Sequence, residues 1–549
     1  MGKPQHRLFD DEVAAAQSAA GGSELGQNAV PFRLEDFAGI ATFRDKPIFN
    51  QEQVINQLDT GRKFNTANGT ITFGFMDGPT AVGLYNSPKY QREFFVTEGF
   101  GFREFNDGQK AAARQTMVLW DDLIAVKIVE KNGNGADILF ASDINTQAGF
   151  GYYPGEGHKF QGDVWVGAPE VNWVPNWLQY NGFGFTAMVH ESGHALGLSH
   201  PGAYNGSAAF SYQNYAEYAQ DSLQYSIMSY FNIQNTGGLV VNGSILQLGN
   251  PQTPLIHDIL AIQAKYGADP ATRVGDTNYF SNSNAGNGVY DLSQNPYPYL
   301  AVYDAGGEDT FDFSTANRSV FIDLRPGSFS SAGLGAPSLE LANKLVAEFN
   351  AATEAPQPDF TPWTSSAQLE SIANQIGAQM VGRVFADTGV AGLFTIGHRN
   401  ISIAYNTIIE NANGGSARDY LVGNHVSNKL SGNAGDDVLN GLGGDDLLTG
   451  GSGADEFRFT DGSGNDRIAD FVSGSDRISL SEIDANSGTA GDQAFTFIGG
   501  AAFSNSAGEL RSYSQGGENF LAGDVNGDGL ADFTINLGSA AAAVSDFFL

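Results

Sequence analysis

The stretch 190–201 carries side chains that could do metal chemistry. It reads His-Glu-Ser-Gly-His-Ala-Leu-Gly-Leu-Ser-His-Pro. Residues four apart share one face of a helix, so His190 and His194 can offer their imidazoles to a single ion. Gly197 is suited to end that helix in a left-handed turn, which would return the chain and bring His200 to the same ion. Three imidazoles leave a fourth position for water, as in a catalytic zinc site.

Glu191 follows the first histidine directly, so its carboxylate is aimed beside the metal and can act as a general base. The alternative is an amphipathic helix with two solvated histidines. That interpretation leaves the glycine, the third histidine and the apolar Leu196 and Leu198 unexplained. The sequence therefore predicts one catalytic zinc ion with Glu191 as the base.

Periodic segments on both sides of this motif would position it. The helix that carries the histidines is expected to begin near Gly184 or Phe185. Apolar spacing of three and four, or alternation of two, marks the other elements. Helices are expected at 51–58, 107–123 and 254–266, with Asn50, Asp107 and Thr253 as N-caps, and strands at 70–75, 136–141 and 163–166.

The role of the strands 136–141 and 163–166 stays open at this point. A substrate peptide could add itself to an exposed edge of such a sheet, because main-chain hydrogen bonds accommodate almost any sequence. The alternative is that both are ordinary interior strands. The pattern favours neither.

The segment Ser226-Ile227-Met228-Ser229-Tyr230 follows the histidines in the chain. Alone, Met228 would be core filler. Downstream of an extended zinc motif, it predicts a turn that forms an apolar floor under the three ligands. Tyr230 could bring its phenol to the zinc or to the developing oxyanion.

Composition sets the wider frame. The 549 residues predict two or three domains. A net charge of −33 disfavours nucleic acid and anionic membranes as partners and suggests bound cations. With no cysteine, zinc must rely on histidine and oxygen ligands. Residues 1–30 lack the apolar core of a Sec signal peptide, and no later run is long enough for a transmembrane segment.

A nine-residue period runs from Gly414 to 458 and matches GGxGxDxUx, the calcium-binding repeat of parallel β-rolls. Glycines permit the turns, carbonyls and aspartates supply hard oxygens, and the eighth residue fills the interior. Glycine-rich disorder, the alternative, does not explain the strict register. Asn428 stands where the other repeats have Asp, so the second repeat should bind calcium more weakly. The expected calcium ligands are Asp419, Asp437, Asp446 and Asp455, and the interior residues are Leu421, Leu430, Leu439, Leu448 and Phe457.

The extended histidine motif, the Ser-Ile-Met-Ser-Tyr segment and the later helix Pro-Leu-x-x-Asp-Ile together resemble the serralysins, secreted zinc endopeptidases of the metzincin group. The resemblance covers most of the chain from about residue 45. It implies an α+β metzincin catalytic domain, with a twisted mixed sheet plus helices. An all-β domain of parallel β-roll and β-sandwich type would follow it.

The same resemblance implies several more calcium ions where the domains meet. It also implies protein or peptide substrates, a protein inhibitor, export by a type I secretion machinery, and a monomer. The additional calcium ligands that it implies are Arg273, Gly275, Thr277, Asp304, Gly306, Gly307, Asp309 and Glu410.

Domain limits follow from these features. Residues 1–44 would be a leader, a zymogen propeptide or a disordered terminus. The segment 326–397 has no recognised counterpart and is expected to be an insertion, with helical periodicity at 338–351 and 365–381. The expected domains are 45–267 for catalysis and 268–549 for the roll, with repeats at 414–458 and C-terminal strands and a secretion signal at 459–549.

Two C-terminal segments keep alternatives. Residues 524–532 space oxygen ligands as an EF-hand-type loop does, but Ile535 stands where the bidentate glutamate belongs, so an Asx-rich turn is equally compatible. The last residues, 546–549, resemble an uncleaved type I export signal, and the alternative is a final strand.

These observations predict a secreted, zinc-dependent endopeptidase of extracellular proteins that is stabilised by calcium. The alternative is a calcium-dependent surface or matrix-binding protein with a vestigial protease domain. Intact Glu191, the three histidines and Met228 argue against that alternative, because a decayed enzyme has no need of a base beside its metal.

Overall fold

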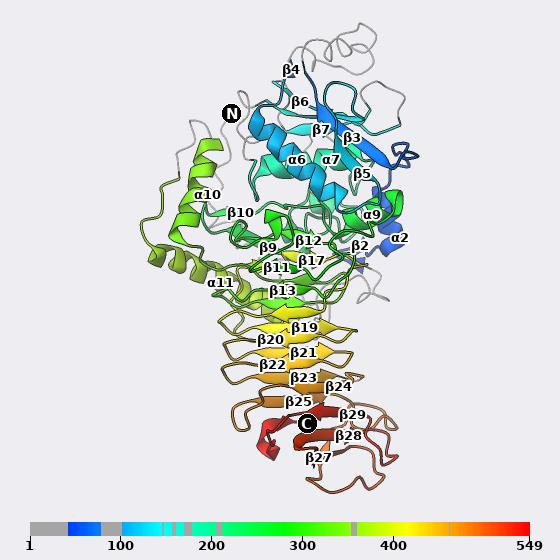
Figure 1. Ribbon diagram of the computed structural model, residues 1–549, viewed down its shortest axis with the longest axis vertical. Helices are drawn as coiled ribbons and strands as arrows, with labels where there is room; N and C mark the ends of the chain where they lie inside the picture. Colours follow the sequence, from blue (N-terminus) through cyan, green and yellow to red (C-terminus); the bar gives the residue numbers. More distant parts are fainter. Residues whose placement is uncertain are drawn as a thin grey trace.

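The computed structural model describes residues 42–77, 102–144, 146, 148–155, 161–168, 178–204, 211–352, 360–460 and 462–549. They form an elongated molecule, with helices and a mixed sheet in the upper part of the view and a column of stacked strands below (Figure 1). The expected leader, 1–44, lies almost entirely outside the described residues. No helix in the described ranges has the length and apolar character to cross a membrane.

The N-terminal sheet has the order β5-β3-β6-β8-β7, and β4 pairs with β6. Strands β3, β5, β6 and β8 run parallel, whereas β7 is antiparallel to β8. The strands expected at 136–141 and 163–166, β6 and β8, are both interior, and the sheet ends in β5 on one side and in β7, which the sequence did not reveal, on the other. The bounds are β3 (Thr70–Phe75), β4 (Phe102–Arg103), β5 (Lys127–Glu130), β6 (Ile138–Asp143), β7 (Gly149–Gly151) and β8 (Val164–Gly167).

Two helices pack against this sheet and against each other. They are α6 (Asp107–Asp121) and α7 (Phe183–Ala195), and the indole N–H of Trp120 donates to the carbonyl oxygen of Val189 at 3.2 Å. The N-cap of α6 is Asn106 rather than the expected Asp107, because its side chain accepts from the N–H of Gln109 and the Gln109 side chain accepts in return. The bond from Trp120 to Val189 joins α6 to the helix of the histidines.

A second helix pair is α2 (Gln51–Leu58) with α9 (Ile256–Tyr266). As expected, α2 begins after Asn50. However, α9 begins two residues later than expected, and Leu255 replaces Thr253 as its N-cap. The reason is that the Asp258 carboxylate accepts the N–H of Leu255 at 2.8 Å.

The remaining short elements are β1 (Thr42–Phe43), β2 (Lys46–Pro47), α8 (Tyr212–Tyr215), β9 (Leu239–Asn242), β10 (Gln247–Leu248), β12 (Leu300–Val302), β15 (Phe329–Ser330), β16 (Gly397–His398) and β17 (Ile401–Ile403), with 3-10 turns at Ile233–Thr236 and Gly288–Tyr290. A further 3-10 turn, Val544–Asp546, lies at the C-terminal end of the column (Figure 1).

The column consists of two stacked sheets, and the strands alternate between them from β18 to β25, whereas β26 to β29 all belong to the larger sheet. One sheet contains β14 (Phe321–Asp323), β19 (Tyr420–Asn424), β21 (Val438–Leu442), β23 (Glu456–Thr460), β25 (Arg477–Glu482) and β30 (Phe547–Phe548). The other contains β11 (Asn278–Phe280), β13 (Thr310–Asp312), β18 (Asn411–Asn413), β20 (Lys429–Ser431), β22 (Leu447–Thr449), β24 (Asn465–Ile468), β29 (Phe533–Asn536), β28 (Glu518–Asp524), β27 (Glu509–Gln515) and β26 (Thr496–Phe497).

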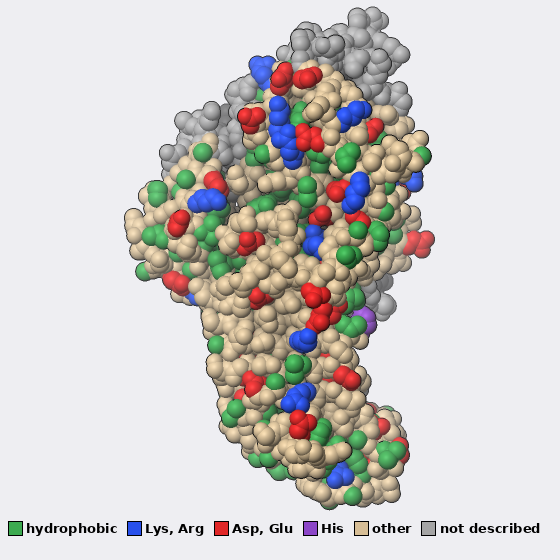
Figure 2. Space-filling model, in the orientation of Figure 1, with side chains coloured by type: hydrophobic (Ala, Val, Ile, Leu, Met, Phe, Trp, Pro, Cys, Tyr) green, Lys and Arg blue, Asp and Glu red, His purple; other side chains and the backbone are tan. Residues whose placement is uncertain are grey.

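Each turn of the column uses two nonapeptides. Lys429 pairs with Asn411 and Val438 with Tyr420, both in parallel register. The five expected interior residues are each at most 1% exposed, so the predicted role of the eighth position is confirmed. On the face drawn in Figure 2, the column shows mainly uncharged polar side chains and backbone, because its repeat aspartates are buried.

The segment 326–397 forms the two expected helices, α10 (Leu339–Ala352) and α11 (Ser366–Thr388), and the second is longer than expected. Met380 of α11 packs in one apolar cluster with Val241 of the N-terminal half and Val438 of the column. Strand β16 then pairs with β9, so one small sheet contains strands from both sides of the expected boundary at 267. The segment therefore bridges the two halves.

The two C-terminal segments have local structural roles. The carboxylate of Asp524 accepts the N–H groups of Gly527 and Gly529, and Asp532 accepts that of Val525. These bonds close the loop on itself and are compatible with both interpretations, so the choice between an EF-hand-type loop and an Asx-rich turn stays a prediction. Strand β30 pairs with β25, so the terminus is a final strand, and an export role for it stays a prediction.

Neighbouring leucines of β22 offer a test of the column interior. Leu448 is fully buried, whereas Leu447 is 36% exposed. Leu448→Ala should destabilise the column by about 2–5 kcal/mol because it leaves a cavity, and Leu447→Ala should cost within about 0.5 kcal/mol. Calorimetry of the calcium-loaded chain would measure both, and equal costs would contradict the assigned register.

Candidate functional site

Helix α7 and the turn after it bring the three predicted histidines together. The Nε2 atom of His200 lies 3.2 Å from that of His190 and 3.0 Å from that of His194. Gly197, just beyond the helix, has φ 98°. A Cβ there would also collide with the carbonyl oxygen of Arg62. Only glycine satisfies both constraints, so this residue allows the chain to return His200 to the helix.

The other nitrogen of each ring is held by the backbone. Nδ1 of His190 contacts the carbonyl oxygen of Ile227 at 2.7 Å, that of His194 contacts Leu198 at 2.7 Å, and that of His200 contacts Tyr204 at 3.0 Å. A carbonyl only accepts, so each Nδ1 carries the proton and each Nε2 presents a bare lone pair.

The cluster therefore fits a cation. Burial lowers the pKa of His190 to about 4 and that of His200 to about 3, so the rings are neutral near pH 7. Burial also lowers the pKa of His194 far below its ordinary value. Three facing lone pairs without a proton repel one another unless a positive ion lies between them, and neutral imidazoles are good ligands for a divalent transition metal.

Glu191 is buried between α7 and the edge strand β7. A Cβ on Gly149 would lie 2.8 Å from its Cγ, so the strand runs directly against this side chain. Burial raises the pKa of Glu191 to about 8, and a hydrogen bond from the Gly151 backbone offsets part of that rise. A dication bound at the histidines would favour the carboxylate and lower the pKa again.

The segment 226–230 lies beneath the helix. Met228 is fully buried, and its sulfur would be 2.6 Å from a Cβ placed on Gly193. The carboxylate of Asp258, on α9, accepts the Ser226 hydroxyl and the Ile227 N–H, each at 2.6 Å. Asp258 supports the turn from the Pro-Leu-x-x-Asp-Ile helix that carried the resemblance, but no local pattern in the sequence predicts this contact.

Tyr230 stands at the open side of the cluster. Its ring centroid lies 4.5 Å from that of His200 and 5.9 Å from that of His190, and the residue is 41% exposed. Burial of the remainder, followed by the charge of Glu191, raises its pKa to about 12. The phenol therefore keeps its proton and can donate a hydrogen bond.

Seven of the residues implied as junction calcium ligands lie in one cluster. Asp309 accepts the Thr277 N–H at 2.8 Å and donates its own N–H to Glu410 at 2.7 Å. Asp304 accepts the N–H of Gly306. Gly307 closely approaches the carbonyl of Gly275. Burial, with the nearby Asp304 and Glu410, raises the pKa of Asp309 to about 7, as expected of acids gathered without a counter-ion.

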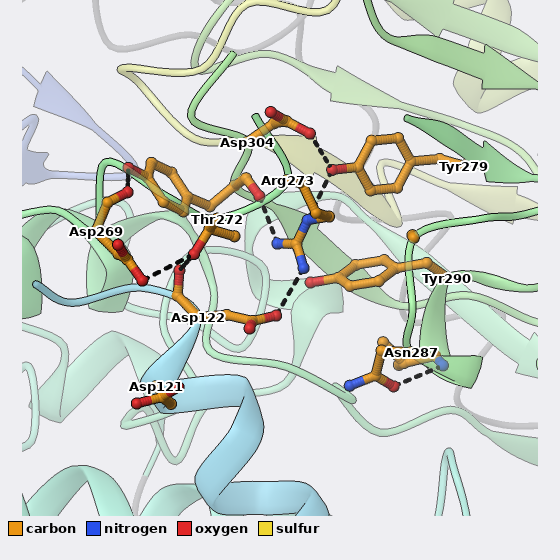
Figure 3. Close-up of polar contacts among 12 residues, drawn as sticks. Asp121, Asp122, Asp269, Thr272, Arg273, Tyr279, Asn287, Tyr290 and Asp304 are labelled. Carbon is orange, nitrogen blue, oxygen red and sulfur yellow. Dashed lines mark hydrogen bonds and ion pairs between the residues drawn. The ribbon is translucent and has the colours of Figure 1, made fainter. Parts of the chain in front are cut away.

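Arg273 instead pairs with an acid of the N-terminal half (Figure 3). Its guanidinium lies 2.6 Å from the Asp122 carboxylate, at the end of α6, and donates to the carbonyl oxygen of Tyr303 at 2.6 Å and to the Tyr279 hydroxyl at 3.0 Å. That hydroxyl donates in turn to Asp304 at 2.7 Å. The side chain is a cation, so only the carbonyl oxygen of Arg273 could ligate a metal.

The repeat aspartates form two ladders along the column, because each turn contains two nonapeptides. Asp437 accepts the N–H of Asp419 at 2.7 Å, Asp446 that of Asn428 at 2.8 Å, and Asp455 that of Asp437 at 2.9 Å. Within the described ranges, the second carboxylate oxygens of Asp437 and Asp446 are buried without a hydrogen-bond partner. A hard cation would satisfy them.

Each ladder has one further member that the nine-residue register does not predict. Asp466 accepts the N–H of Asp446 at 2.9 Å, and Asp476 accepts that of Asp455 at 3.1 Å. Longer turns place them 20 and 21 residues along the chain instead of 18. The local pattern Gly462-Ser463-Gly464-Asn465-Asp466 carries the signal, outside the nine-residue register.

The fold and the site define a two-part protein, in which a buried histidine cluster is joined to a parallel β-roll. Residues 268–355 and 377–549 match the family described as Peptidase M10 serralysin C terminal. The gap, 356–376, falls within the expected insertion 326–397, whose limits stay a prediction.

Relatives align with nearly the whole chain. Metallopeptidase AprA of Pseudomonas marginalis is 34% identical, over 97% of this chain and 98% of the relative. Metalloprotease AprA of Pseudomonas entomophila is 35% identical, over 92% and 91%, and Serralysin G of Dickeya chrysanthemi is 33% identical, over 92% of each. The chain belongs to the serralysin family of metalloproteases, which confirms the resemblance.

The buried aspartates of the two ladders predict an unusual dependence of stability on pH. Burial raises the pKa of Asp437 and Asp446 to about 7 and that of Asp466 to about 8, against about 3.9 in an unfolded chain. Between these values the folded state binds more protons than the unfolded state. In a calcium chelator, therefore, stability should fall as pH rises from about 5 to about 8.

Added calcium should reverse this trend, because it binds the deprotonated ligands. Thermal unfolding of the full chain, in EGTA and in calcium across this pH range, would measure both slopes. A column that grows more stable with rising pH in EGTA would contradict the interpretation of these aspartates as an acidic site that needs a cation.

Proposed function

We propose that this protein is a secreted, zinc-dependent endopeptidase that hydrolyses peptide bonds of extracellular proteins. The observation that carries the proposal is the convergence of three unprotonated imidazole nitrogens beside a buried glutamate. Membership of the serralysin family supports the peptidase activity and the secreted location. The metzincin fold of the catalytic half, 45–267, is part of the same proposal.

The kind and number of donor atoms indicate which metal the site would bind. Three neutral imidazoles with one open position suit zinc, held by His190, His194 and His200. A zinc ion there would polarise the scissile carbonyl and lower the pKa of the attacking water. Glu191 takes the proton from that water and passes it to the leaving amine. Tyr230, with its proton retained, donates to the oxyanion, and Met228 supports the ligands from below.

The column would be stabilised by calcium. Buried carboxylate oxygens of Asp309, Asp437 and Asp446 have no hydrogen-bond partner among the described residues, which supports this role. Asp419, Asp455 and Asp466 belong to the same two ladders as Asp437 and Asp446. The implied monomer, protein inhibitor and type I export through the terminal residues complete the proposal on family grounds.

Glu191→Gln should separate catalysis from metal binding. The amide keeps the shape of the side chain but cannot act as a base, so kcat on casein should fall by about 100- to 10,000-fold. Zinc content, measured by mass spectrometry of the purified protein, should stay near one ion per chain. Full activity of this variant would refute the mechanism, and a wild-type protein without zinc or proteolysis would favour the calcium-dependent binding protein.

Tyr230→Phe removes only the phenolic oxygen. Because the proposed bond forms in the transition state, kcat should fall by about 100- to 1,000-fold with little change in KM. Steady-state kinetics on a peptide substrate would show the split. A rise in KM at constant kcat would instead assign Tyr230 to substrate binding.

A further inference from the structure

His200 is the ligand with the least local support. His190 and His194 lie on α7, whose backbone hydrogen bonds fix their positions. His200 lies beyond the end of that helix, in a segment without regular structure. Its ring must still be held within a few tenths of an ångström for tight binding of a metal. Some other part of the molecule therefore has to fix this ring.

Tyr204 contacts the ring in two ways. Its carbonyl oxygen accepts the Nδ1 proton of His200 at 3.0 Å, and its own ring stacks on the imidazole, with centroids 5.5 Å apart and planes inclined by 22°. Tyr204 is only 3% exposed, and its ring also lies 5.1 Å from that of Tyr230. The position of Tyr204 therefore sets that of the third histidine.

Asp221 holds Tyr204 in place. One carboxylate oxygen accepts the hydroxyl of Tyr204 at 2.8 Å and that of Ser229 at 2.7 Å. Asp221 is completely buried, and no described residue donates to its other oxygen. Burying a carboxylate with so few donors costs free energy. Its contacts join the segment after His200 to the turn that carries Tyr230.

We propose that Asp221 and Tyr204 are positioning residues for His200. The carboxylate fixes the tyrosine through its hydroxyl, and the tyrosine carbonyl and ring fix the imidazole. Through Ser229, the same carboxylate sets the distance between the third ligand and Tyr230. This inference rests on the proposed zinc site and deepens it, because partners of this kind typically change metal affinity by about 10- to 100-fold.

Tyr204→Phe is the sharpest test, since it removes the hydroxyl and keeps the carbonyl and the ring. A matched control is Tyr212→Phe. Tyr212 belongs to the same buried cluster, but its hydroxyl donates to the carbonyl oxygen of Ala219 at 2.6 Å. In the full calcium-loaded chain, zinc affinity would be measured by competition with a chromophoric chelator, and ligand geometry by the visible spectrum of the cobalt-substituted protein.

Tyr204→Phe should weaken zinc binding by about 10- to 100-fold, alter the cobalt spectrum, and lower kcat with KM nearly unchanged. Tyr212→Phe should match the wild type in all three. Equal zinc affinity and an unchanged cobalt spectrum in Tyr204→Phe would overturn the inference. Wild-type protein that binds no zinc would instead overturn the proposed function.

Substitutions of Asp221 supply the rescue. Asp221→Ala should weaken zinc binding at least as much as Tyr204→Phe does. Asp221→Asn keeps an oxygen that can accept both hydroxyls, so it should restore most of the affinity. An asparagine variant that fails as completely as the alanine variant would contradict the positioning role. If Asp221→Ala does not fold, the comparison of Tyr204→Phe with Tyr212→Phe still tests the inference.

Discussion

Three backbone carbonyls determine the chemistry of the histidine cluster. Because each accepts an Nδ1 proton, each imidazole turns an unprotonated nitrogen toward the other two, at separations of 3.0 and 3.2 Å. The carbonyls belong to Ile227 in the turn, to Leu198 shortly beyond the end of α7, and to Tyr204 in the loop after His200. Helix α7 alone could not create this arrangement, so the surrounding loops are part of the site.

The column shows the same logic with carboxylates. Its aspartates accept backbone N–H groups in two ladders, one through Asp437 and one through Asp446, and both residues keep a second oxygen buried, so the folded chain gathers acceptors that need a cation. Arg273 connects the two halves physically: it pairs with Asp122 at the end of α6, and Trp120 of that helix donates to α7 beside His190. A series of direct contacts therefore links the junction to the helix that carries the histidines.

The sequence could predict what depends on local spacing. The period of four placed His190 and His194 on one face, and the period of nine identified the interior of the column, where Leu448 is fully buried. It could not identify Asp221 or Asp258, because their partners lie in segments brought close only by packing. Ser226, for example, meets Asp258 across 32 residues of chain. Strand β7 escaped notice because Gly149–Gly151 is too short to show a pattern.

The helical segment 326–397 supports the histidine site through the turn 226–230. Arg399 pairs with Asp387 at the end of α11 and donates to the Thr236 carbonyl oxygen at 3.1 Å. The Thr236 hydroxyl donates to the side chain of Gln224 at 2.8 Å, just before the segment that holds Met228. The turn is thus supported from α9 by Asp258 and, through Thr236, from α11. The gap in the family match, 356–376, covers the first part of α11, whereas Asp387 and Arg399, which carry this support, lie within the matched range 377–549.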